Sequence, residues 1–537
     1  MVRAGPTHVL QKGQQPSTSS LRPLTDTPSV IPPAHEDSAD VDTVRMQQMD
    51  EDPTKLKVES AVEVKHEQSD GDRMPPRLLQ LQVCALVFLA GLDMVLLHCC
   101  FLALRMDLGL SLGELSTLQV VQSVGATLSA PVWAALADGT HVSRKRILIV
   151  GAIGQGIVSL LLGFVTWWGP MIALRALNGM MLSSLKPLVD GIVADHTSKL
   201  RRGRMYGRVI LAMHAGSFFG TLVGTPMSTS LFFGGLQGWR VVFGLSGLLG
   251  VVAGGWVAVS MDLPRREKSS KGQDVNACLI RKETKRLARF LRIPTFDVLI
   301  LTGIFGTVGM SAGGFKTLYF QMVGIDDALA GTISSCGTVA VGLGVLLGGC
   351  IGDFFAARCK HHGRALTAQI SIAMGIPLEF LMLWGIAPFN GNLAWYIVLT
   401  CLHGVFATWP LTAAKLPLLS ELVPEEDRPS LMAWDGTLEH LSGTLLGGPM
   451  VAFIASTFFG FDEADVETGK SSVNAQALGH ASTVMICGPL TVCLFCWFLL
   501  HWSYPKDLDR IAREGEPKSP CDVGPPCAGA NPELSSV

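Results

Sequence analysis

The chain has 537 residues, of which 48% are hydrophobic and only 16% are charged, whereas soluble globular proteins carry about 25% charged residues. Its formal net charge of −2 excludes the strongly basic balance of a typical nucleic-acid-binding protein. A chain of this length would need several soluble domains, and it lacks the charged residues to cover their surfaces, so the placement of charge along the chain decides its class.

Charge is concentrated in residues 1–77, which hold 13 acidic and 9 basic side chains among many Pro, Ser and Gln. No apolar period of a helix or strand is present there, so we predict a disordered, slightly acidic tail. No apolar stretch of a signal peptide follows Met1. The tail is therefore expected to stay in the cytosol, where it is synthesised.

From residue 78 onward the chain consists of apolar segments of about 20 residues, the length that crosses a bilayer. Six precede a charged gap and six follow it: 78–104, 114–137, 146–168, 170–195, 205–228, 238–260, 294–321, 329–352, 365–387, 393–420, 429–458 and 479–502. A single segment could be a core helix of a soluble protein, but twelve in succession exclude that class. We predict an all-α membrane protein with twelve transmembrane helices.

The connections between these segments differ in their basic residues. One set, at 138–146, 195–208, 261–293, 353–364 and 420–429, holds 22 Lys and Arg, and the other set holds three. Because Lys and Arg are enriched in cytosolic loops, we predict a multi-pass membrane protein with both termini in the cytosol.

The chain also repeats itself, because GTLVGTPM at 220–227 recurs as GTLLGGPM at 443–450. The repeated small residues and prolines, which suit tight helix packing, are Gly220, Gly224, Pro226, Gly443, Gly447 and Pro449. Such internal repeats are common in secondary transporters. The predicted organisation is a tail at 1–77, six-helix bundles at 78–260 and 294–503, a cytosolic loop at 261–293 and a cytosolic tail at 504–537.

Motifs at the helix ends resemble those of a known family. The pattern G-x-x-x-D-R-x-G-R-R is approached after the eighth segment by Gly349, Asp353, Arg358, Gly363 and Arg364. The first half departs from this pattern, with Ala134 at the first Gly and Gly139 at the first Arg. Together with Arg175-Ala-Leu-Asn-Gly179 in the fourth segment, these motifs make residues 78–503 resemble the major facilitator superfamily.

The resemblance implies two pseudo-symmetric six-helix bundles and a secondary active or facilitative transporter that works by alternating access. It implies no enzyme activity, no cofactor and no metal. The implied partners are the lipid bilayer, a small-molecule or lipid-like substrate and, in a coupled transporter, protons; a monomer is expected. The stretch from Asp93 through LGLS at 108–111 to Asp138 also resembles spinster-type lysolipid transporters. A transporter of that type and a non-transporting receptor or sensor on the same fold stay open as alternatives.

Charged residues at the cytosolic helix ends form a first group of candidate site residues. They are Asp138, Arg144, Lys145, Asp195, Asp353, Arg358 and Arg364. We interpret them as a charge relay that holds the two halves together on the cytosolic side in one conformation. Helix capping and the setting of topology are the alternative roles.

Ionisable residues inside the segments form a second group, because such residues are costly in a bilayer and often functional. They are Asp93, His98, Arg175, His214, Lys316 and His403. In the family that the chain resembles, segments one, four, seven and ten line the cavity, so Asp93, Arg175 and His403 are expected to converge. Asp93 is the expected proton or ion carrier, with Arg175 as its partner or as a substrate clamp; a static pair is the alternative.

Other charged residues carry narrower expectations. Glu379 lies in the ninth segment, which is peripheral in that family, so a packed, protonated side chain is expected. Lys186 and Asp190 are four residues apart and are expected to pair. Residues 281–292 predict a basic amphipathic helix, either on the inner leaflet or in solvent.

Two other classes lack the residues that they need. An ATP-driven pump would contain G-x-x-x-x-G-K-[ST], and the Gly-Lys-Ser at 469–471 has Ala464 in place of the first Gly. A membrane enzyme would need a catalytic cluster at one membrane face, and no His-rich box or paired carboxylate motif is present at the cytosolic helix ends.

Overall fold

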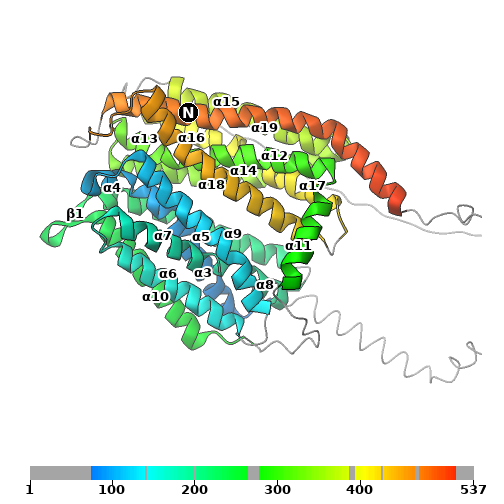
Figure 1. Cartoon of the computed structure of the whole chain (residues 1–537), viewed down its shortest axis with the longest axis horizontal. Coiled ribbons are helices and arrows are strands. Elements are labelled where there is room, and N and C mark those ends of the chain that lie inside the picture. Colours follow the sequence, from blue (N-terminus) through cyan, green and yellow to red (C-terminus); the bar gives the residue numbers. More distant parts are fainter. Residues whose placement is uncertain are drawn as a thin grey trace, which may run out of the picture. The chain divides into compact units, whose positions relative to one another are not determined.

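The computed structural model describes residues 74–138, 142–198, 201–263, 277–385, 393–424, 427–465 and 471–515. Most of the predicted tail 1–77, the tail beyond residue 515 and part of the loop 261–293 lie outside the described residues. The described residues form helices and one short hairpin (Figure 1).

The first half is built from α3 (Arg77–Cys99), α4 (Phe101–Leu108), α5 (Leu112–Asp138), α6 (Arg144–Leu162), α7 (Trp168–Leu182), α8 (Leu185–His196), α9 (Arg202–Thr229) and α10 (Gly238–Ser260). Strand β1 (Leu231–Phe232) pairs antiparallel with β2 (Leu236–Gln237) around η1 (Phe233–Gly235), with Leu231 opposite Gln237. The helix breaks between α7 and α8 because Pro187 has no N–H to continue the hydrogen-bond ladder.

The second half begins after α11 (Ala277–Phe290). It is built from α12 (Pro294–Ala312), η2 (Gly313–Phe315), α13 (Lys316–Met322), α14 (Asp327–Arg358), α15 (Gly363–Phe380), η3 (Leu381–Gly385), α16 (Leu393–Phe406), η4 (Pro410–Lys415), α17 (Leu416–Glu421), α18 (Arg428–Phe458) and α19 (Ser472–Gly515). Pro410 interrupts the path from α16 to α17, and η4 continues it as a π-helix.

The fold is the all-α membrane fold that the sequence predicts. Ten helices among the described residues are long and apolar enough to cross a membrane. The two other predicted segments, 114–137 and 170–195, are helical as α5 and as the interrupted pair α7 and α8. The count of twelve crossings stays a prediction.

The same helix pairs pack in both halves. In the first half α3 packs on α9, α6 on α10 and α5 on α7; in the second, α12 packs on α18, α15 on α19 and α14 on α16. The halves meet through α5 against α18 and α9 against α14, which are equivalent contacts in the two repeats. The packing therefore has the pseudo-twofold symmetry of a duplicated unit.

The repeated glycines lie at two of these equivalent contacts. A Cβ on Gly220 would lie 2.8 Å from the Val95 side chain of α3, and one on Gly443 would lie 2.6 Å from Thr307 of α12. Gly224 and Gly447 continue the two faces one turn later, and Pro226 and Pro449 lie inside α9 and α18. Small residues let the paired backbones approach closely.

The buried hydrophobic residues show where the halves join. At the end with α4 and the hairpin, one core contains residues of both halves, such as Phe101 and Phe315. At the other end there are two cores, one of the first half, with Leu148, and one of the second half, with Trp497. We call the end with the shared core the closed end and the other the basic end.

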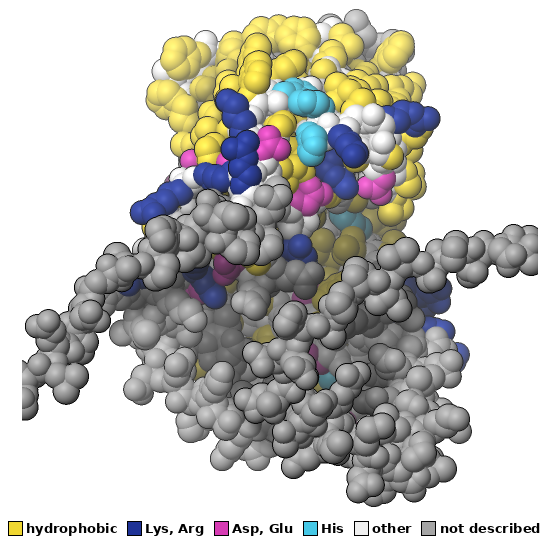
Figure 2. Space-filling view, turned by 90° about the vertical axis from the view of Figure 1, so that its right-hand side faces the viewer, with side chains coloured by type: hydrophobic (Ala, Val, Ile, Leu, Met, Phe, Trp, Pro, Cys, Tyr) yellow, Lys and Arg dark blue, Asp and Glu magenta, His cyan; other side chains and the backbone are white. Residues whose placement is uncertain are grey.

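The basic end carries the connections rich in Lys and Arg, and Figure 2 shows dark blue side chains gathered there beside acidic ones. Helix α11 lies at this end with α8 and α17 (Figure 1). Phe290 of α11 is buried in the core of the second half, and Arg286 pairs with Asp427 at 3.5 Å. The predicted helix exists, but its apolar side docks on the protein instead of lying free in solvent.

Candidate functional site

A buried polar cluster lies where α3, α5, α6 and α7 meet. Asp93 of α3 is fully buried, and an unpartnered carboxylate there would be costly. Its Oδ1 accepts hydrogen bonds from Gln155 Nε2 (3.0 Å), Asn178 Nδ2 (3.3 Å) and Ser159 Oγ (3.4 Å). Its Oδ2 accepts one from Gln122 Nε2 at 3.1 Å. These residues and Arg175 are the Asp93 cluster.

Arg175 of α7 is also fully buried and joins the cluster through a neutral amide. Its Nη2 donates to Gln122 Oε1, and Gln122 in turn donates to Asp93, so the two charges are bridged. Among the described residues, Nε and Nη1 of Arg175 have no hydrogen-bond partner, and its Cζ lies 5.9 Å from the Phe243 ring centroid. These unused N–H groups could still bind a carbonyl or anionic group.

A second cluster lies in the other half, where α13, α15 and α16 meet. Lys316 Nζ lies 2.7 Å from Glu379 Oε1 and 2.9 Å from Glu379 Oε2. His403 Nε2 lies 3.4 Å from Glu379 Oε2. Glu379 is fully buried, whereas the Lys316 and His403 side chains are 23% and 20% exposed. The Lys316 ammonium is thus partly accessible to a molecule in the space beside this group of residues, the Glu379 cluster.

The two clusters occupy equivalent places in the repeat. Lys316 follows Asp93 by 223 residues, the offset between Gly220 and Gly443. Glu379 follows Gln155 by 224 residues, and both contact the charged group of the first membrane-spanning segment of their half. The polarity is inverted, because a carboxylate in one half stands where an ammonium stands in the other.

Asp93 and Arg175 share a cluster, whereas His403 lies beside Glu379 in the other half, so the convergence of all three on a cavity stays a prediction. Glu379 is not an isolated packed carboxyl, because it is paired with Lys316. The expected pairing of Lys186 with Asp190 is confirmed at 2.7 Å.

The remaining predicted histidines lie elsewhere. His98 packs between the halves, with its ring 5.2 Å from that of Phe101, and a Cβ on Gly314 would lie 2.7 Å from His98 Nε2. His214 lies on α9 and is partly exposed.

The predicted cytosolic charge relay makes contacts within each half. Arg144 pairs with Asp195 at 2.6 Å, joining α6 to α8. Arg364 lies 3.5 Å from Asp353 and donates to the carbonyl of Ala413 at 3.0 Å. The Arg358 guanidinium lies 3.7 Å from the Phe354 ring centroid.

These contacts do not bridge the halves in this conformation, in which the two cores are separate at the basic end. The relay was expected to join the halves in only one conformation, so that expectation stays a prediction. Lys145 is partly exposed, and the side chain of Asp138 lies outside the described part of the chain.

A lock that the sequence analysis missed joins the halves at the closed end. Arg105 of α4 pairs with Glu463, which follows α18. Its Nη2 also donates to the carbonyls of Asp462 (3.2 Å) and Glu463 (3.1 Å), and its Cζ lies 4.8 Å from the Phe461 ring centroid. A second link joins Thr229 Oγ1 to Asp327 Oδ2 at 2.6 Å.

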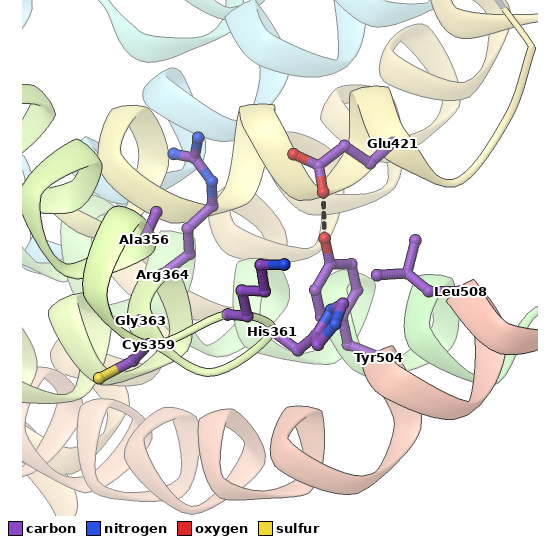
Figure 3. Close-up of a pocket in the computed structure, with 9 residues that line it drawn as sticks. Ala356, Cys359, His361, Gly363, Arg364, Glu421, Tyr504 and Leu508 are labelled. Atoms are coloured by element: carbon purple, nitrogen blue, oxygen red, sulfur yellow. Dashed lines mark hydrogen bonds between the residues drawn. The ribbon is translucent and has the colours of Figure 1, made fainter.

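A pocket of about 350 Å³ opens at the basic end of the second half (Figure 3). Tyr504 and Glu421 point toward one another across it and are hydrogen-bonded, and His361 lies beside the Tyr504 ring. Arg364 also lines it, so the pocket adjoins the predicted relay and lies outside both buried clusters.

Comparison with known proteins identifies a family and several relatives. The profile of the Major Facilitator Superfamily matches residues 83–351, half of the chain. Multidrug resistance protein MdtG of Proteus mirabilis is 24% identical over 341 residues, which cover 62% of this chain and 77% of that protein. Protein spinster of Drosophila melanogaster is 26% identical over 185 residues, which cover 34% of this chain and only 29% of spinster.

The fold itself matches a solved structure, that of a bacterial homologue of the human lysosomal transporter Spinster in an inward-facing, unoccupied conformation. The TM-score is 0.68 at 15% sequence identity, and the match covers 81% of this chain and 99% of that one.

Proposed function

Because the chain belongs to the Major Facilitator Superfamily, we propose that it is a secondary transporter that moves a small organic solute by alternating access. The observation that carries this proposal is the asymmetry of the cores, which are shared at the closed end and separate at the basic end. A central site between such halves would be reached from the basic end. With both termini in the cytosol, as the basic connections favour, this is the inward-open state.

The Asp93 cluster is the proposed coupling site. Each hydrogen bond that the Asp93 carboxyl accepts comes from a neutral amide or hydroxyl. Arg175 is the cation that Gln122 links to this carboxyl, so a shift of α7 relative to α3 would change the distance between the carboxyl and its counter-charge.

The alternative role of this cluster is a static pair that fixes packing. A static network needs all of its buried donors satisfied, and two N–H groups of Arg175 are not. The cluster therefore has the capacity to accept a further group, which supports a working site over a purely structural one.

The substrate class follows from which cations are engaged. Lys186, Lys316 and Lys415 are all paired with carboxylates, so these three cations are not free to bind an organic anion. We therefore favour a neutral or amphipathic solute. A lysolipid-like amphiphile is the second candidate, supported by the match to Drosophila spinster over 185 residues.

Reconstitution into liposomes tests this proposal. The purified chain should accumulate a lysophospholipid or an amphipathic dye such as ethidium under an imposed pH gradient, and a protonophore should abolish the accumulation. The matched control is Asp262→Asn, which removes an exposed carboxylate after α10. Uptake that ignores the protonophore would contradict proton coupling, and no flux of either probe would favour the receptor alternative.

A further inference from the structure

A third group of charges is buried in the second half, away from the Asp93 and Glu379 clusters. Lys415 at the end of η4 lies 3.1 Å from Asp435 Oδ2 and also pairs with Glu439. Asp435 and Glu439 are four residues apart on α18 and therefore share one helix face. The three residues are only 4%, 5% and 8% exposed, respectively.

The elements packed around this triad define its surroundings. Helix α12 contributes Gly303, where a Cβ would collide with the Glu439 carboxyl and the Lys415 ammonium, and Thr307, which donates to the Glu439 carbonyl at 2.9 Å. Helix α19 contributes the thiol of Cys493, which donates to the Thr302 carbonyl at 3.2 Å.

The nearest basic group on α15 is engaged elsewhere. Arg364 donates to the carbonyl of Ala413 in η4 and lies 3.5 Å from Asp353. Arg364 is therefore paired with Asp353. Lys415 is the cation that contacts the two carboxyls of the triad.

The charges of the triad do not balance. The Glu379 cluster pairs one carboxylate with one ammonium, and the Asp93 cluster holds one carboxylate and one guanidinium. The triad has two carboxyls for one ammonium, and an uncompensated charge buried in this way costs several kcal/mol. When two carboxyls share a site, one of them holds a proton far more tightly than an isolated carboxyl does.

A second observation also indicates a bound proton. Among the described residues, Asp435 Oδ1 is buried and has no hydrogen-bond partner, although Oδ2 of the same carboxyl faces Lys415. An oxygen without a donor suits the neutral acid better than the carboxylate, because a neutral carbonyl oxygen left unpaired in the interior costs less free energy than a charged carboxylate oxygen.

We propose that the Lys415–Asp435–Glu439 triad is a proton-binding site that holds one proton in this conformation. Its role in transport rests on the proposed function. Helix α18 packs on α5 of the other half and on α12 of its own, so a movement between the halves would also move both carboxyls relative to Lys415. Lys415 lies on η4, a different element from the α18 helix that carries the two carboxyls. A π-helical turn such as η4 is often found at functional sites.

Infrared difference spectroscopy of the full chain in lipid nanodiscs tests the site without any transport assay. A pH titration should reveal the carbonyl band of a buried protonated carboxyl, which shifts in deuterated water. Asp435→Asn and Glu439→Gln should each remove this band, because either change leaves one carboxylate paired with one ammonium. Glu421→Gln, a change of an exposed carboxylate, should leave the band intact.

Removal of the cation should have the opposite effect on the protonated-carboxyl band. Lys415→Met should increase the protonated-carboxyl band about twofold, because both carboxyls then lose their counter-charge. A band that survives both Asp435→Asn and Glu439→Gln would overturn the proposal, as would its absence from the unmodified chain. If Lys415→Met does not fold, Asp435→Asn and Glu439→Gln still test the proposal. An absence of flux in liposomes would refute the proposed transport function. It would not affect the spectroscopic evidence for a proton-binding site.

Discussion

The lock at the closed end gives a quantitative prediction for Arg105→Met. Arg105 is 2% exposed and its partner Glu463 is 36% exposed. Methionine keeps apolar bulk against Phe461 and removes the charge, and Glu463 is exposed enough to be rehydrated. The reverse change, Glu463→Gln, would leave the buried guanidinium without its counter-charge and is a poorer test.

The magnitude follows from the bonds that are lost. A hydrogen bond that involves a charged group contributes about 1.5–3 kcal/mol, and the exposure of Glu463 lowers its share. We take a net loss of about 2 kcal/mol for the closed state. This loss shifts the ratio of closed to open states at this end about 30-fold, because 1.4 kcal/mol corresponds to a factor of ten.

Pulsed electron resonance distances between spin labels at Thr166 and Ser456 provide the assay. Both positions are exposed; Thr166 precedes α7 and Ser456 lies near the end of α18, so the pair spans the closed end. Arg105→Met should move population toward longer distances, and Arg105→Lys, which keeps the charge but loses the planar fork, should do so less. An unchanged distance distribution in Arg105→Met would refute the idea that this lock holds the halves together.

Two further changes test the clusters and the packing. Glu379→Gln should leave the Lys316 ammonium beside a neutral amide, so affinity for an anionic amphiphile should rise relative to a neutral one in a binding titration; equal affinities would argue that Lys316 does not face the solute. Gly443→Val should lower the thermal stability of the purified chain, because its Cβ would lie 2.6 Å from Thr307. The control Gly436→Val, with nothing within 4 Å, should keep or slightly raise the stability, because valine is a better helix former than glycine by a few tenths of a kcal/mol. Equal melting temperatures would contradict the packing described for α18.

The segments could be predicted because apolar length is a local property of the sequence. Hydropathy reports which residues leave water, so it located the helices from residue 78 onward. It does not detect a missing N–H, and the breaks before α8 and at η4 depend on Pro187 and Pro410. The sequence analysis treated both segments as continuous helices.

The site could be predicted only in part. Asp93 and Arg175 stand out because charges are rare inside membrane segments. Their bridge Gln122 does not stand out, because neutral polar residues are common there and the contact depends on helix rotation. Glu379 was misplaced by the expectation that its segment is peripheral, although the repeat offset already set it where Gln155 stands in the first half.

Arg105 was missed for a different reason. It is one of the three basic residues in the connections that are poor in Lys and Arg, and in the sequence it bears only on the topology. Its partner lies in the acidic stretch 462–465 of the other half, 358 residues away along the chain. Charge complementarity between these two connections was the available signal, but only the fold shows that they meet.

The most direct test of the central claim compares proton-driven uptake with exchange in liposomes that contain the unmodified chain or Asp93→Asn. We predict that an imposed pH gradient drives accumulation of the lysophospholipid or ethidium probe in the unmodified chain. Asp93→Asn should abolish this accumulation and retain exchange of probe between the two sides, because the carboxyl that carries the proton is lost while alternating access remains. Accumulation by Asp93→Asn equal to that of the unmodified chain would contradict the account.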